Sequence, residues 1–130
     1  MSVGFIALEI QEDIAWVTEN FSFPLLENKQ FHHLTVAFKP SGELIQELSP
    51  KIGTEYTLNV VGYYSDNDIN LLSIEDLPGL PIQNIHPHIT VSCAPGIKPA
   101  HSNAVLHDNR TLPAPNNLTL TGKLYFHHWG

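Results

Sequence analysis

His33-Leu34-Thr35-Val36 and His88-Ile89-Thr90-Val91 are two copies of one pattern: a histidine, an aliphatic residue, a threonine and a valine. The copies begin 55 residues apart (88 − 33), and each lies in a stretch rich in apolar and β-branched residues. Given the composition of the chain, the pattern is expected ~0.01 times by chance. Two occurrences therefore indicate a repeated structural unit, and they decide how the rest of the chain is interpreted.

Alternation along a strand determines what each copy presents, because successive side chains point to opposite faces. One face is expected to hold His33, Thr35 and Ala37 in the first strand, and His86, His88, Thr90 and Ser92 in the second. The opposite, apolar face is expected to hold Leu34, Val36 and Phe38, and Ile89, Val91 and Cys93. If both strands bury their apolar faces and lie close together, two imidazoles and two hydroxyls meet in one pocket.

The remaining periodicities predict an α+β chain around these strands. Short apolar or β-branched runs predict strands at residues 3–10, 31–38, 55–65, 69–74, 86–94 and 118–126. Apolar spacing and capping residues predict helices at residues 11–21, from 41 or 42 to 48, and 99–107. No long linker separates these elements, so we expect a single domain over residues 1–130.

Charge and cysteine content exclude several classes of protein. The formal net charge is −7, from six Lys and Arg against 13 Asp and Glu. Proteins that bind long nucleic acids usually carry a basic surface instead. The single cysteine, Cys93, rules out an intramolecular disulfide and a cysteine-based zinc site. No apolar run reaches the roughly 18 residues of a membrane span. We therefore expect a soluble, cytoplasmic protein with neither a membrane nor a long nucleic acid as its partner.

Two histidines and two threonines around one pocket suit phosphodiester cleavage. One neutral imidazole can take a proton from an attacking hydroxyl, while a protonated one gives a proton to the leaving oxygen. Threonine hydroxyls can donate to the nonbridging phosphate oxygens. This chemistry requires no metal, and we expect no cofactor. His33 and His88 are therefore the candidate catalytic residues, and Thr35 and Thr90 are candidate substrate-binding residues.

Further residues are candidates for contact with the substrate. His86 shares the expected face of His88, and Lys123 and Tyr125 share the polar face of the last strand. His32 is an alternative to His33, because a register shift of one residue would exchange their positions.

The paired His-x-Thr motifs resemble those of the 2H phosphoesterase superfamily. That resemblance implies a bilobed α+β fold, with two pseudo-symmetric β-sheet lobes, flanking helices and a central cleft. It also implies His33 and His88 as the catalytic pair, and Thr35 and Thr90 as phosphate ligands. Larger members have a long helix between the lobes, where residues 75–85 are short and proline-rich. This compact form resembles phage-encoded members that degrade cyclic nucleotide signals of bacterial antiviral immunity.

The resulting hypothesis is a metal-independent phosphodiesterase whose partner is a small nucleotide, foremost a cyclic oligonucleotide signal. One alternative is a 2′,3′-cyclic phosphodiesterase of RNA end processing. Another is a non-catalytic module that captures a nucleotide. A third is a metal site built from His86, His88 and another histidine. Base preference, oligomeric state and the assignment of acid and base stay open at this point.

Overall fold

The fold is described from a computed structural model that places residues 2–115 and 117–129. Its strands are β1 (Ser2–Ile10), β2 (Asn28–Lys29), β3 (His33–Phe38), β4 (Glu55–Ser65), β5 (Ile69–Ile74), β6 (His88–Cys93), β7 (Leu112–Pro113) and β8 (Thr119–Trp129). Its helices are α1 (Ile14–Phe21), α2 (Gly42–Leu48) and α3 (His101–His107), with a 3₁₀ turn, η1 (Ser49–Lys51). The α+β class is confirmed, and each predicted strand and helix is present. Only the short β2, β7 and η1 lie outside the predicted set.

Capping residues set where the first two helices begin. Asp13 is the N-cap of α1, because its carboxylate accepts a hydrogen bond from the Ala15 N–H at 3.1 Å. The helix therefore begins later than the periodicity alone predicts. Ser41 caps α2 in the same way, with its hydroxyl accepting from the Leu44 N–H at 3.2 Å. Among the described residues, no helix is long and apolar enough to cross a bilayer.

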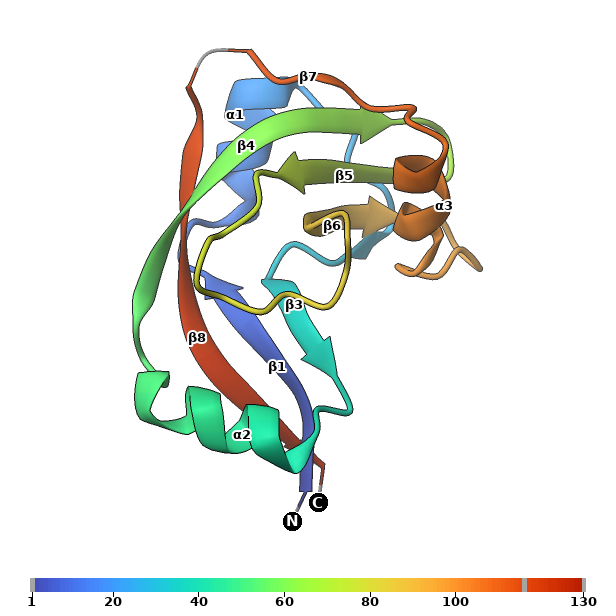
Figure 1. Cartoon of the computed structure of the whole chain (residues 1–130). Coiled ribbons are helices and arrows are strands. Elements are labelled where there is room, and N and C mark those ends of the chain that lie inside the picture. Colours follow the sequence, from blue (N-terminus) through green and yellow to red (C-terminus); the bar gives the residue numbers. More distant parts are fainter. Residues whose placement is uncertain (1, 116, 130) are drawn as a thin grey trace.

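The strands form one antiparallel sheet that bends at β4. Its order is β2-β6-β5-β4-β8-β1-β3, and β7 pairs with β4 off this path. The first part of β4 pairs with β8 and its second part pairs with β5, so the strand belongs to two half-sheets (Figure 1). The bend brings β3 and β6, which lie near opposite ends of the strand order, next to each other. Each half-sheet therefore contributes one His-x-Thr strand.

Apolar side chains from both half-sheets form the main core. Leu8 and Leu34 of the first half-sheet and Ile89 of the second are fully buried in one cluster, together with Val17 of α1 and Leu48 of α2. A second cluster lies under α3, where Val105 and Leu106 pack on the second half-sheet. Cys93 is buried in this second cluster with Ile69 and Leu71, whereas Ile89 and Val91, whose face it was predicted to share, belong to the main core.

Both motif strands carry a β-bulge at the same position of the motif. In β3, Thr35 pairs with Ala7 and Ala37 with Ile6, so Val36 is an extra residue. In β6 the same break in register leaves Val91 as the extra residue. The repeat of the tetrapeptide is therefore also a repeat of backbone geometry, and bulges are common beside active sites.

The bulges correct four of the predicted faces, those of Ala37, Phe38, Ser92 and Cys93. Beyond Val36 the alternation is reversed, so Ala37 is buried, while Phe38 is 57% exposed instead of lying in the core. Beyond Val91, Ser92 leaves the face of His88 and Thr90. Its hydroxyl donates to Asn70 Oδ1 at 2.7 Å and accepts from the Leu26 N–H. An extra residue in the strand thus changes which side chains reach the pocket.

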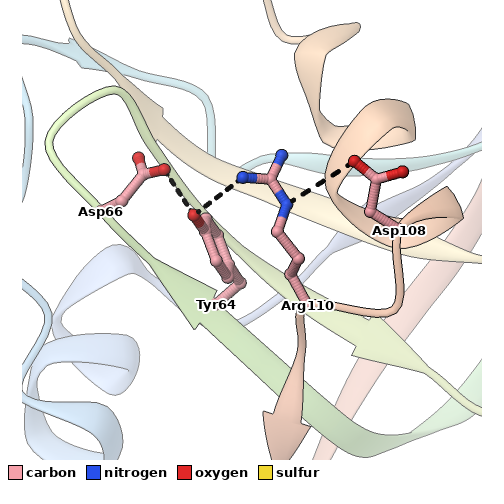
Figure 2. A network of polar contacts seen from close by, with 4 residues as sticks. All are labelled: Tyr64, Asp66, Asp108 and Arg110. Carbon is pink, nitrogen blue, oxygen red and sulfur yellow. Dashed lines mark hydrogen bonds and ion pairs between the residues drawn. The ribbon is translucent and has the colours of Figure 1, made fainter.

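A surface network ties the β4–β5 turn to the segment after α3 (Figure 2). The Tyr64 hydroxyl donates to Asp66 at 2.5 Å, and this bond raises the pKa of Tyr64. Arg110 lies over the Tyr64 ring, at 5.4 Å from its centre, and donates to the phenol oxygen at 3.4 Å. Arg110 also lies 3.9 Å from Asp108. Arg110 thus links the segment after α3 to β4 at the surface.

Candidate active site

A cavity of about 460 Å³ lies where β3 and β6 meet. All four motif residues line it: His33 and Thr35 from β3, and His88 and Thr90 from β6. Its wall is completed in part by Phe38 and the amide side chains of Gln30, Gln83, Asn84 and Asn103. None of the described lining residues is a Lys, Arg, Asp or Glu. Histidines, hydroxyls and amides therefore make up the polar lining of the cavity.

A main-chain hydrogen bond orients the His88 ring. Its Nδ1 lies 2.9 Å from the carbonyl oxygen of His86. A carbonyl oxygen can only accept, so Nδ1 carries the hydrogen, and in the neutral ring Nε2 has the lone pair. Burial lowers the pKa of His88; the bond to the His86 carbonyl opposes this, and the His86 ring adds to it. His88 therefore has Nε2 available as a proton acceptor near neutral pH.

Aromatic stacking holds the His33 ring. The Phe5 ring lies between His33 and His127, with centroid distances of 5.5 Å and 4.5 Å. The His32 ring also stacks on the His33 ring, with 5.4 Å between the ring centroids. Burial lowers the pKa of His33, and repulsion from His32, His127 and His88 lowers it further. Of these three rings, His88 has the smallest effect on the pKa of His33.

The two threonines have different surroundings. Thr35 is exposed at the cavity, and its hydroxyl makes no hydrogen bond within the described part of the chain. Thr90 is only 9% exposed, and its Oγ1 lies 2.8 Å from the hydroxyl of Ser102 in α3. Thr90 Oγ1 is also 3.5 Å from the Pro99 carbonyl oxygen. A ligand can therefore reach Thr35 directly, whereas Thr90 already belongs to a buried pair of hydroxyls.

The weaker candidates lie away from the cavity wall. His86 precedes β6, and it contributes through its main chain, since its carbonyl orients His88. Lys123 and Tyr125 lie on β8 and are not lining residues. Lys123 pairs with Glu9 and Glu55 in the sheet register, and the Tyr125 ring packs edge-on against Phe5 at 6.3 Å. Burial and Glu9 raise the pKa of Tyr125.

Phe38 and the amide side chains that line the cavity were not predicted as site residues from the sequence. Phe38 reaches the cavity because of the bulge at Val36, which leaves no trace in an apolar alternation. Gln83 and Asn84 belong to the proline-rich connection before β6, which has no periodicity to interpret. Asn103 lies on the predicted helix α3, but its place at the cavity depends on how that helix packs beside β6.

Two imidazoles and two threonines are presented to a ligand in one cavity. One ring has a fixed tautomer, the other is stacked in place, and a hydroxyl is exposed beside them. Across the described residues, no three His, Cys, Asp or Glu side chains gather in a way that could hold a metal ion. Two histidines that line one cavity can supply proton transfer.

Comparison with solved structures gives a likeness in fold at low sequence identity. No family model matches the chain, and no curated protein matches it. Among solved structures, the crystal structure of E. coli LigT complexed with 3′-AMP aligns over 99% of this chain and 91% of that chain. The sequence identity is 16% and the TM-score is 0.41. At such values the case for a function depends on the residues of this chain alone.

Proposed function

We propose that the chain is a metal-independent phosphodiesterase of the 2H phosphoesterase type that acts on small nucleotides. One observation carries the proposal: the two His-x-Thr motifs, from opposite half-sheets, line a single cavity. His33 and His88 transfer protons, while Thr35 and Thr90 donate to the phosphate. The matched bulges at Val36 and Val91 support equivalent roles for the two strands.

The favoured substrate is a cyclic oligonucleotide signal. One histidine takes the proton of a ribose 2′-hydroxyl, and the 2′-oxygen forms a bond to phosphorus. The bond from phosphorus to the 5′-oxygen breaks, and the other histidine gives that oxygen a proton. The products are a linear nucleotide with a 5′-hydroxyl and a 2′,3′-cyclic phosphate end. Two histidines are needed because one must remove a proton from the 2′-oxygen while the other gives a proton to the 5′-oxygen.

Charge and size support a small nucleotide over a polymer. The chain has a net charge of −7, and the described cavity lining has no basic side chain beyond its histidines. A protein surface that binds a long nucleic acid would need Lys or Arg side chains at successive phosphates. The cavity volume of about 460 Å³ falls within the range of small-molecule sites, roughly 300–1,000 Å³. The second candidate substrate is a 2′,3′-cyclic phosphate, which water opens with the same pair of histidines.

The test is turnover in EDTA of a nucleotide panel read by chromatography. The panel contains cyclic di- and trinucleotides, a 2′,3′-cyclic mononucleotide and a 2′-5′ oligoadenylate. We expect turnover of at least one compound, with loss in both His33→Ala and His88→Ala. His107→Ala is the matched control, because His107 is an exposed histidine on α3 outside the cavity. It should keep the wild-type rate.

Each other outcome has a defined meaning. Activity that persists in His33→Ala or His88→Ala contradicts the assigned pair. Binding without turnover favours the capture module, and activity lost in EDTA and restored by a divalent metal favours a metal site. A cyclic oligonucleotide with 2′-hydrogen in place of the 2′-hydroxyl should resist cleavage, and its cleavage would contradict internal attack.

A further inference from the structure

The Gln83 side chain is held so that its NH₂ group is left for a ligand. The Phe38 main-chain N–H can only donate, so the Gln83 atom that it meets at 3.3 Å is the amide oxygen, Oε1. The main-chain N–H of Gln83 donates to the Val36 carbonyl at 2.8 Å, and this bond fastens the connection before β6 to β3. The remaining polar group of this cavity-lining side chain is the Nε2 donor.

The same reasoning orients a second pair of amides in the wall. The His86 N–H donates to Asn84 Oδ1 at 2.8 Å. Asn84 therefore donates through Nδ2 to Asn103 Oδ1, at 2.7 Å. The NH₂ group of Asn103 is left over, and within the described residues neither it nor that of Gln83 has an acceptor. The main-chain N–H groups of Phe38 and His86 thus fix the orientation of the amides. This side of the cavity therefore has two NH₂ donors without an acceptor among the described residues, those of Gln83 and Asn103.

Phe38 places an aromatic surface beside these donors. It is 57% exposed, lines the cavity and is linked to Gln83 by the hydrogen bond of its N–H. Lys39 lies over the ring, at 5.6 Å from its centre. An exposed aromatic ring next to a phosphate site is a platform on which a nucleobase can stack.

We propose that Phe38, Gln83 and Asn103 form a nucleobase subsite that selects bases with an exocyclic carbonyl over bases with an exocyclic amino group. A carbonyl oxygen of guanine, hypoxanthine or uracil accepts from the NH₂ groups. The amino group of adenine or cytosine at that position meets them donor to donor, and it leaves them without an acceptor. This inference rests on the proposed function, since the phosphate must occupy the motif residues for the base to reach the subsite.

The test compares hypoxanthine with adenine on identical sugar-phosphates. The probes are inosine and adenosine 2′,3′-cyclic monophosphates, and cyclic di-IMP and cyclic di-AMP. In wild type, kcat/KM should favour hypoxanthine by about 10- to 100-fold. Gln83→Glu keeps an acceptor for the Phe38 N–H but replaces the donor with a carboxylate oxygen. We expect the preference in this variant to fall below one.

A matched control separates the subsite from the added charge. Gln46→Glu makes the same change on the exposed face of α2, outside the cavity, and should keep the wild-type ratio. Turnover with equal kcat/KM for both bases overturns the subsite and leaves the phosphodiesterase intact. If none of these four probes is turned over, the wider panel in EDTA decides the proposed function, and calorimetric binding of cyclic di-IMP and cyclic di-AMP decides the subsite. Tighter binding of cyclic di-IMP supports it, and equal or absent binding overturns it.

Discussion

Replacing the paired hydroxyls of Thr90 and Ser102, singly and together, separates their structural role from their role in catalysis. Their oxygens lie 2.8 Å apart; Ser102 is fully buried and Thr90 is 9% exposed. Thr90→Val keeps the shape of the side chain but leaves the Ser102 hydroxyl without this partner, which costs about 1–3 kcal/mol of unfolding free energy. Ser102→Ala leaves Thr90 with only the Pro99 carbonyl at 3.5 Å, which costs about 1 kcal/mol.

The double variant removes both polar atoms from this contact. Replacing both partners of a buried hydrogen bond by apolar groups is close to neutral, so its loss of stability should be smaller than the sum of the single losses. Urea unfolding at pH 7.5 measures all four proteins. Strictly additive losses would show that the two hydroxyls do not interact.

Activity should follow a different pattern from stability across the same four proteins. If the Thr90 hydroxyl donates to a charged phosphate, Thr90→Val loses about 1.5–3 kcal/mol of binding, or about 10- to 150-fold in kcat/KM. The double variant should recover stability but not activity. Recovery of both would refute the assignment of Thr90 as a phosphate ligand.

Three further predictions concern pH and packing. The pKa values of His33 and His88 are both lowered, and the reaction needs one ring neutral and one protonated, so kcat/KM should peak below pH 6.5. His127 lowers the pKa of His33, so His127→Asn should move the peak to higher pH. A shift of the peak to lower pH would contradict this. The unfolded chain binds more protons than the folded chain below pH 6.5, so the free energy of unfolding, measured in urea, should fall as pH drops from about 7.5 to 5. The fall should be smaller in a His33→Asn/His88→Asn variant. An equal dependence of this free energy on pH in both proteins would contradict the lowered pKa values. Gly122→Ala puts a Cβ 2.9 Å from the Leu8 Cβ and should cost about 1–3 kcal/mol, whereas Gly42→Ala adds a methyl group in open space and should cost nothing; equal effects would contradict the packing at Gly122.

Strand and helix positions could be predicted because they follow from local periodicity. The alternation around His33 and His88 and the caps at Asp13 and Ser41 are encoded within a few residues. These features need no knowledge of distant contacts. A shared pocket for the two motifs was expected only if the two strands lie close together, as the resemblance to the 2H phosphoesterase superfamily implies.

The features that escaped prediction depend on contacts between distant segments. An extra residue such as Val36 is defined by its partner strand, so the exposure of Phe38 cannot be read from the alternation. The Thr90–Ser102 bond and the orientation of Gln83 likewise require the placement of α3 and of the proline-rich connection. Tertiary contacts of this kind decide which polar groups face the ligand.

The most direct test of the central claim is the initial rate in EDTA of wild type, His33→Ala, His88→Ala and the double variant, on the best substrate of the panel. Each single variant should lose about 10²- to 10⁴-fold in kcat. Because both rings serve one proton-transfer step, the double variant should be hardly slower than the slower single variant. A single variant within tenfold of wild type, or losses that multiply in the double variant, would contradict catalysis by this pair.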